Sequence, residues 1–276
     1  MQVGIETRRA PSSEGASIFY RVYESGAPRR GTVILVHGLA SSGGQFDEEA
    51  KRFALKGYRV LVPDLRGHGQ TGAPRQPIRV SDYSIPVLAA DMLAVLEHAG
   101  AENVHWVGNS LGGILALSLL GTPARTRIES LALFGTCFAL DLPAAVSPVF
   151  KLAFLPGLAT TAWLTARSTT GNSLGQRAIV AAIRQLDVDA AAAIASHVRR
   201  YDFRANALGY ERPLLLLRGG KDRAVNLGLR RDLDTFAARP NFTGVDLPRG
   251  GHCANFDMHE EFCAALEAHW ARAAAS

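Results

Sequence analysis

The sequence has few cysteines, few lysines and no long hydrophobic run. Its three cysteines, Cys137, Cys253 and Cys263, are an odd number without metal-ligand spacing, which argues against a disulfide framework and favours a reducing compartment. No stretch reaches the roughly 18 apolar residues that a membrane-spanning helix needs, so we expect no transmembrane segment. The amino terminus also lacks the basic and apolar segments of a signal peptide, and we therefore expect a cytoplasmic protein.

A concentrated basic surface is also missing. The 30 basic residues exceed the 25 acidic residues by only five, and four of the basic residues are lysines. The arginines are scattered in short pairs such as Arg8-Arg9 and Arg199-Arg200, whereas nucleic-acid-binding proteins cluster their positive charge. We expect no nucleic-acid partner.

What the sequence does contain is a large apolar fraction. Of 276 residues, 47% are hydrophobic and 20% are charged, a balance typical of a globular protein with a substantial core. This length allows two domains, but α/β folds often use about 250 residues as one domain. We expect one large domain with an insertion.

Short β-branched or apolar runs alternate with helical patterns along the chain. We predict strands over residues 17–23, 32–36, 58–62, 104–107, 131–134, 214–217 and 244–247. We predict helices over 45–56, 85–99 and 111–120, and near 228–238 and 258–273. Such alternation predicts an α/β fold, with a mostly parallel sheet covered by helices on both faces. Ligands bind such sheets beyond the carboxyl ends of the strands.

One segment interrupts the alternation. Residues 139–206 contain no convincing strand and read as helices separated by proline and glycine turn signals. We interpret this segment as a helical lid inserted into a core domain that comprises residues 1–138 and 207–276.

The strongest local motif is Gly108-Asn109-Ser110-Leu111-Gly112, which lies between a predicted strand and a predicted helix. The pattern Gly-x-Ser-x-Gly in this context is typical of a sharp turn that exposes a nucleophilic serine. The glycines allow the strand and the helix to approach closely, and the helix amino terminus favours developing negative charge.

With this motif the sequence resembles the α/β-hydrolase family, over roughly residues 30–135 and 210–270. The supporting segments are Leu35–Gly38, Val62–Gly69, Gly108–Gly113, Arg218–Asp222 and Gly250–His252. The resemblance implies an α/β-hydrolase fold and the chain order nucleophile, acid, histidine. It therefore implies Ser110 as nucleophile, Asp222 as the acid and His252 as the general base. Asp141 is a distant second candidate for the acid.

The resemblance also implies an oxyanion hole made by the backbone N–H groups of Leu39 and Leu111. It suggests structural roles for the segment from Asp64 to His68 and a loop-ordering role for His37. We expect Cys253 to be a packed thiol. No grouping of side chains suggests a metal ion, and we expect no cofactor.

The lid sequence suggests an apolar substrate, because residues 137–164 carry only Asp141 and Lys151 as charges. These apolar side chains either line a substrate pocket or simply pack the lid onto the core. The candidate pocket residues are Gly38, Asn109, Phe138, Phe150, Phe154, Trp163 and Cys253.

The predicted function is hydrolysis of a carboxylic ester or lactone of a small to medium hydrophobic substrate. The segment Gly251–Asn255 is similar to that of enol-lactone hydrolases. The alternative is carbon–carbon bond hydrolysis of a ring-cleavage diketone, although such enzymes commonly carry tryptophan where this chain has Cys253. A non-catalytic ligand-binding member of the fold is a remote alternative. The sequence leaves open whether the protein is a monomer or a homodimer.

Overall fold

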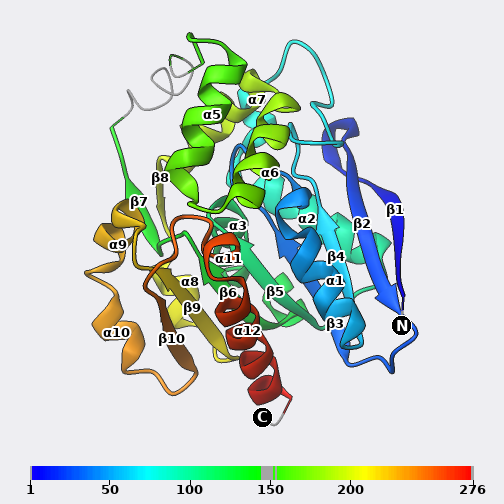
Figure 1. Ribbon diagram of the computed structural model, residues 1–276, viewed down its shortest axis with the longest axis vertical. Coiled ribbons are helices and arrows are strands. Elements are labelled where there is room, and N and C mark those ends of the chain that lie inside the picture. Colours follow the sequence, from blue (N-terminus) through cyan, green and yellow to red (C-terminus); the bar gives the residue numbers. More distant parts are fainter. Residues whose placement is uncertain (1, 144–151, 153, 275–276) are drawn as a thin grey trace.

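The chain forms one eight-stranded sheet with helices on both faces (Figure 1). The computed structural model describes residues 2–143, 152 and 154–274. In spatial order the strands are β1 (Val3–Pro11), β2 (Ser17–Ser25), β4 (Tyr58–Pro63), β3 (Gly31–Val36), β5 (Val104–Asn109), β6 (Ile128–Phe134), β9 (Leu214–Gly219) and β10 (Phe242–Leu247). From β4 to β10 neighbouring strands are parallel, while β1 and β2 are antiparallel additions at one edge. The predicted fold class is confirmed.

Two hydrophobic layers hold the helices on the sheet. Successive strand residues point to opposite faces, so Ile34 and Val36 join one core while Val33 and Leu35 join the other. The first core contains α2 (Ile85–His98) and α3 (Leu111–Leu120), and the second contains α1 (Asp47–Leu55) and α12 (His259–Ala273). This two-sided burial explains why the parallel strands read as continuous apolar runs.

The remaining helices of the large sheet unit are short. They are α8 (Arg204–Leu208), α9 (Arg223–Leu229), α10 (Leu233–Ala237) and α11 (Ala254–Asp257), with 3-10 turns at Ser13–Gly15, Gly43–Phe46, Val80–Tyr83 and Pro123–Arg127. The region predicted as one helix near 228–238 is thus two helices. The first of them begins earlier than expected because the Asp222 carboxylate accepts a hydrogen bond from the Val225 N–H and caps it.

Strand β1 has no counterpart among the predicted strands. It pairs with β2 along its whole length, from Val3 opposite Ser25 to Pro11 opposite Ser17. Most of its side chains are at least partly exposed, and it carries Glu6, Arg8 and Arg9. A polar edge strand of this kind lacks the hydrophobic alternation on which sequence-based strand prediction depends.

The inserted segment lies above the carboxyl ends of the parallel strands, at the top of Figure 1. It contains α5 (Leu158–Thr169), α6 (Ser173–Arg184) and α7 (Val188–Val198). The expectation that this segment lacks strands is wrong, because β7 (Ala139–Asp141) and β8 (Arg200–Asp202) pair antiparallel where the chain leaves and rejoins the large sheet. Three-residue strands are too short to give a sequence pattern. The exact limits of the lid at residues 139 and 206 stay a prediction.

Among the described helices, none combines the length and the hydropathy required to cross a bilayer.

Candidate active site

Ser110 sits on a strained turn between β5 and α3. Its backbone angles are φ 48° and ψ −111°, a region that residues with a side chain rarely adopt. A Cβ on Gly112 would collide with the carbonyl oxygen of Val36 in β3, and a Cβ on Gly108 would lie 2.5 Å from the Gly113 nitrogen. The two glycines therefore permit the close strand–helix contact that presents the Ser110 side chain at the start of α3.

Asp222 and His252 are brought together by two adjacent strands. Asp222 follows β9, His252 follows β10, and the two side chains meet with 2.7 Å between Asp222 Oδ2 and His252 Nδ1. An ionised carboxylate only accepts hydrogen bonds, so Nδ1 of a neutral imidazole carries the proton and Nε2 is left as the acceptor. Asp222 is the more enclosed partner, with 9% of its side chain exposed against 30% for His252.

Ser110 and His252 both adjoin the end of β6. The Ser110 N–H donates to the Phe134 carbonyl oxygen at 2.9 Å. A Cβ on the next residue, Gly135, would lie 3.2 Å from Cε1 of His252. Within the described residues the Ser110 hydroxyl has no hydrogen-bond partner, and catalytic hydrogen bonds often tighten only when substrate binds.

The second candidate for the acid lies elsewhere. Asp141 is in β7, is 74% exposed at its side chain and lies 3.6 Å from the Arg200 guanidinium. It does not contact His252 among the described residues, whereas Asp222 does.

Two buried histidines order the loop that carries Leu39. Nδ1–H of His37 donates to the Gly38 carbonyl at 2.8 Å, and its Nε2 accepts from the Leu65 N–H at 3.0 Å. His68 Nε2 accepts from the Ala40 N–H at 3.2 Å. Burial lowers the pKa of His37 to about 4 and the pKa of His68 to about 3, so both are neutral acceptors near pH 7. His37 thus has a structural contact, as we expected of a loop-ordering residue.

Neither predicted oxyanion donor has a backbone acceptor among the described residues. Leu111 is the first residue of α3, where an N–H has no acceptor inside the helix. Leu39 follows β3 in the loop ordered by His37. Their assignment to an oxyanion hole stays a prediction.

These histidines make stability sensitive to acid. Burial also lowers the pKa of His105 to about 4, below the ordinary value of 6.5. Below pH 6.5 these three imidazoles take up protons in the unfolded chain but stay neutral in the folded protein. The free energy of unfolding should therefore fall with falling pH, with a slope of about 1.4 kcal/mol per pH unit for each such histidine, until pH reaches about 4.

Urea unfolding at about pH 7.5 and about pH 5.5 measures this slope. The His105→Gln variant should show a shallower slope than the wild type because one titrating group is gone. An unfolding free energy that does not change between these two pH values would contradict the assignment of neutral buried histidines.

A buried amide network joins the separate segments of the site. Gln45 Nε2 donates to Asn109 Oδ1 at 3.1 Å and to Asn255 Oδ1 at 3.3 Å. Asn109 Nδ2 donates to the backbone carbonyls of Phe134 and His252, at 3.3 and 3.2 Å. The sequence motifs pointed to Asn109, but Gln45 was not predicted, because its partners are far away in the chain. This network fixes the His252 loop relative to the Ser110 turn.

Asp257 connects the loop that carries His252 to the lid through hydrogen bonds. Its Oδ2 accepts from the Gly251 N–H at 2.7 Å, next to His252. Its Oδ1 accepts from the Thr170 hydroxyl at 2.6 Å and from the Gly171 N–H at 2.9 Å, in the turn between α5 and α6. Sequence reasoning missed this carboxylate, which positions the His252 loop and the α5–α6 turn together.

The candidate pocket residues do not all lie near the predicted triad. Gly38 faces the site, since a Cβ there would lie 3.1 Å from Ser110 Cβ. Phe138 is fully buried and stacks on Phe236 with 3.8 Å between ring centroids. Trp163 is 53% exposed on α5, in a groove lined by no member of the predicted triad. Phe150 lies outside the described residues.

Apolar residues of the lid meet the two loops of the site. We name Ala162, Ala166, Ile179, Ile183 and Cys253 the lid cluster, against which Ala40 and Phe154 also pack. Cys253 follows His252 and Ala40 follows Leu39, so the cluster lies beside the predicted site. Burial raises the pKa of the Cys253 thiol to about 12, which keeps it protonated at neutral pH.

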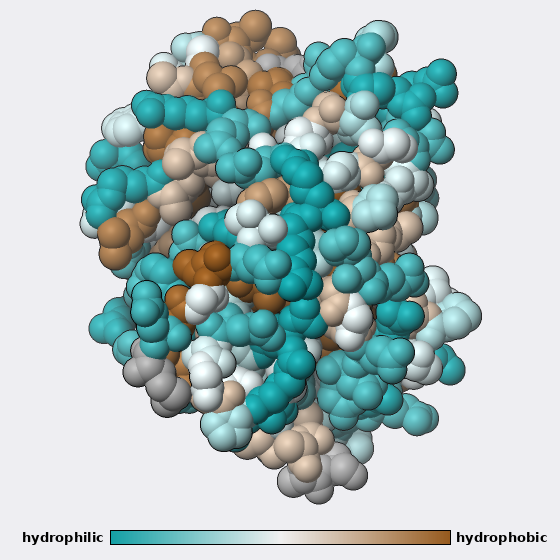
Figure 2. All heavy atoms as spheres, turned by 90° about the vertical axis from the view of Figure 1, so that its right-hand side faces the viewer, coloured by the Kyte–Doolittle hydropathy of each residue, from teal (hydrophilic) through white to brown (hydrophobic). Residues whose placement is uncertain are grey.

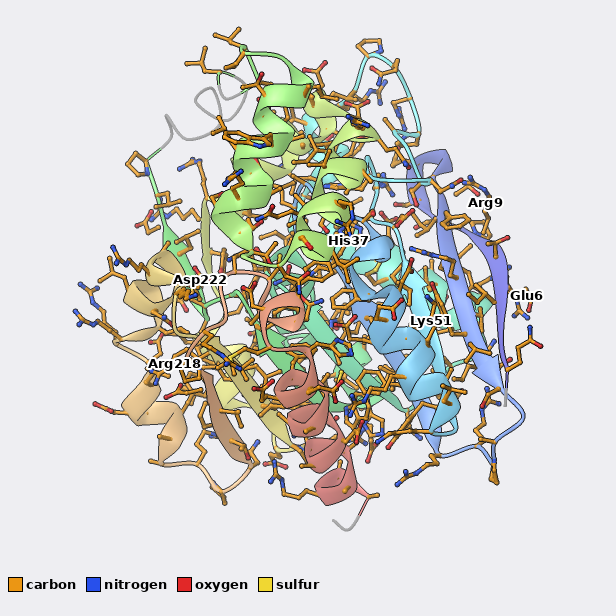
Figure 3. All side chains as sticks on the ribbon, viewed as in Figure 1. Glu6, Arg9, His37, Lys51, Arg218 and Asp222 are labelled. Atoms are coloured by element: carbon orange, nitrogen blue, oxygen red, sulfur yellow. The ribbon has the colours of Figure 1, made fainter. Side chains whose placement is uncertain are left out.

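Figure 3 shows Asp222 and His37 at the level where the sheet meets the lid helices, as expected for a site at the carboxyl ends of the strands. No group of three or more histidine, cysteine or acidic side chains suited to a metal ion occurs in the described part of the chain.

A family model described as the alpha/beta hydrolase fold matches residues 31–176, more than half of the sequence. The chain therefore belongs to the alpha/beta hydrolase fold family.

Among curated proteins, the chain is 34% identical over 140 residues to epoxide hydrolase A of Mycobacterium tuberculosis, covering 46% of this chain and 42% of that protein. It is 31% identical over 124 residues to a non-heme haloperoxidase of Rhodococcus erythropolis, covering 45% of this chain and 42% of that protein. The match thus spans less than half the length of these relatives.

Solved structures match over nearly the whole chain. The enol-lactonase from Burkholderia xenovorans has a TM-score of 0.80 at 22% identity, covering 95% of this chain and 99% of that one. An aryl esterase described as putative, from Burkholderia cenocepacia, has a TM-score of 0.81 at 20% identity, covering 98% of this chain and 100% of that one. At these identities the likeness concerns the fold.

Proposed function

We propose that this protein hydrolyses a carboxylic ester or lactone through an acyl-enzyme formed on Ser110. The observation that carries the proposal is the Asp222–His252 pair, held at 2.7 Å beside the strained turn that presents Ser110. A serine hydroxyl is a weak nucleophile at neutral pH and needs such an oriented base.

The proposed reaction has two halves. His252 Nε2 takes the hydroxyl proton as Ser110 Oγ attacks the acyl carbon, and Asp222 stabilises the imidazolium that forms. The N–H groups of Leu39 and Leu111 stabilise the oxyanion, and His252 returns the proton to the leaving alcohol. Water then attacks the acyl-enzyme by the same route, which releases the carboxylic acid and regenerates Ser110.

The nucleophile argues against epoxide hydrolysis, although an epoxide hydrolase is among the relatives. A serine that opens an epoxide becomes joined to the substrate carbon by an ether bond. An ether has no carbonyl group for water to attack, so the enzyme could not turn over by this route. The same serine on an ester carbonyl forms an acyl ester, which water can cleave.

The lid cluster favours a hydrophobic substrate. Ile179, Ile183 and Phe154 place apolar surface next to Cys253 and Ala40, which adjoin His252 and Leu39 in the chain. Apolar walls of this kind bury ligand surface and exclude water from the reacting groups. A small to medium acyl or aromatic group fits this environment better than a charged one.

Steady-state kinetics on three substrates, one for each candidate reaction, test the proposal. We expect turnover of p-nitrophenyl butyrate, and no turnover of styrene oxide. A ring-cleavage diketone serves as the third substrate, because carbon–carbon bond hydrolysis is the alternative function. Preference for the diketone, measured by its loss of absorbance, would favour that alternative, and turnover of the epoxide alone would contradict the acyl-enzyme.

A further inference from the structure

A concave surface lies on the lid, between α5 and α6. Its volume is about 420 Å³, and the residues that line it include Trp163, Ala166, Arg167, Arg177, Val180 and Arg184. None of these residues belongs to the predicted triad or to the loops that carry it. We call this surface the α5–α6 groove.

The charges of the groove are of one sign. Among the described residues that line it, the ionisable side chains are Arg167, Arg177 and Arg184, and none is acidic. Elsewhere many arginines pair with carboxylates, as Arg218 does with Asp246 at 2.7 Å. None of the three groove arginines lies within ion-pair distance of a carboxylate among the residues that the structure describes. The groove therefore concentrates positive charge that has no described counterion.

Apart from the arginines, the described lining of the groove combines aromatic and aliphatic side chains with two polar ones, Ser173 and Gln176. The guanidinium of Arg167 lies over the Trp163 ring, 4.8 Å from its centroid, and Ala166 and Val180 add aliphatic surface. At the top of the molecule, the end at which the lid lies, Figure 2 shows hydrophobic side chains among hydrophilic ones. The N–H groups of Leu174 and Gly175 at the start of α6 are already bonded to the Asn172 side chain. An anion in the groove would thus be held by guanidinium groups rather than by the helix terminus.

We propose that the α5–α6 groove binds an amphipathic organic anion, a carboxylate attached to an aliphatic or aromatic body. Guanidinium groups match a carboxylate in charge and geometry, and the Trp163 ring and Val180 would contact the body. Arg177 and Arg184 are two helical turns apart, about 10 Å along α6, so one arginine can hold the carboxylate while the body extends along the groove.

This inference does not depend on the hydrolytic activity. A carboxylate of this class is what hydrolysis of a hydrophobic ester would release, so the groove is suited to the product as well as to other carboxylates. Because Ala166 and Val180 belong to the lid cluster or pack against it, the floor of the groove adjoins the apolar wall of the predicted site.

Tryptophan fluorescence tests the proposal without an activity assay. Trp106 and Trp270 are 0% and 1% exposed, whereas Trp163 is 53% exposed, so a ligand in the groove should perturb Trp163 selectively. Titration with sodium decanoate below its micellar concentration should give a saturable change in fluorescence. The change should be absent from the Trp163→Phe variant and should persist in Ser110→Ala.

Matched variants and ligands separate charge recognition from unspecific adsorption. The double variant Arg177→Gln, Arg184→Gln should bind decanoate at least about tenfold more weakly than the wild type does. The wild type should bind uncharged decanol at least about tenfold more weakly than it binds decanoate. Arg125→Gln, which changes an arginine outside the groove, should bind as the wild type does. Equal binding of decanol and decanoate, no saturable change, or a change seen only with anionic vesicles would overturn the proposal. These results hold whether or not the protein cleaves esters, so a failure of either proposal is recognised separately.

Discussion

Replacing Ser110 with alanine should lower kcat for p-nitrophenyl butyrate by at least about 10⁴-fold, because the acyl-enzyme can no longer form. KM should change little, since the hydroxyl makes no hydrogen bond to a described residue and contributes mainly to the transition state. Alanine keeps the Cβ at the strained turn, so the free energy of unfolding should stay within about 1 kcal/mol of the wild type. Steady-state kinetics and urea unfolding measure the two effects.

Ser118→Ala is the matched control, because Ser118 lies two turns further along α3. It removes a hydroxyl from the same helix and should retain wild-type kcat. If Ser110→Ala kept more than about one tenth of the ester turnover, the nucleophile would have to be another group.

Adding one methyl group at Gly112 should damage both stability and activity. In Gly112→Ala the new Cβ would collide with the Val36 carbonyl oxygen, which belongs to the backbone of β3 and cannot rotate away. The helix and the strand must separate, and overpacking of this kind costs about 1–3 kcal/mol or more. The same movement displaces Ser110 and Leu111 from β3, so we expect kcat to fall by about 10²-fold or more in the fraction that remains folded.

Gly26→Ala is the control for this substitution. A Cβ on Gly26 would have no heavy atom within 4 Å, and its stability and activity should match the wild type. Thermal or urea unfolding together with ester kinetics gives the comparison. Wild-type stability and turnover in Gly112→Ala would contradict the close strand–helix contact that presents Ser110.

The parallel part of the fold was predictable because its signals are local. Strands β3, β5 and β9 are buried on both faces and therefore read as short apolar runs. The motif around Ser110 was equally visible, because its five residues are contiguous in the sequence, although Gly112 makes room for Val36 of the neighbouring strand β3. Placing Asp222 after one strand and His252 after another predicted their approach, because neighbouring parallel strands end at the same edge of the sheet.

The parts that were missed depend on partners far away in the chain. Gln45 contacts Asn109 and Asn255 across more than 60 and 200 residues, and no local pattern marks it as important. Asp257 reads as one more surface carboxylate until its contacts with Gly251 and Thr170 are known. Trp163 was assigned to the substrate pocket from composition alone, whereas helix packing turns it toward the α5–α6 groove.

The central claim is that Ser110 is the activated nucleophile, and covalent labelling tests it most directly. Wild-type protein treated with a fluorophosphonate should gain the mass of one phosphonyl group, and digestion should locate that group on Ser110. His252→Gln should react far more slowly, because the base is lost, and Ser110→Ala should not react at this position. An unmodified Ser110 in active wild-type protein, or equal labelling rates in wild type and His252→Gln, would contradict the account.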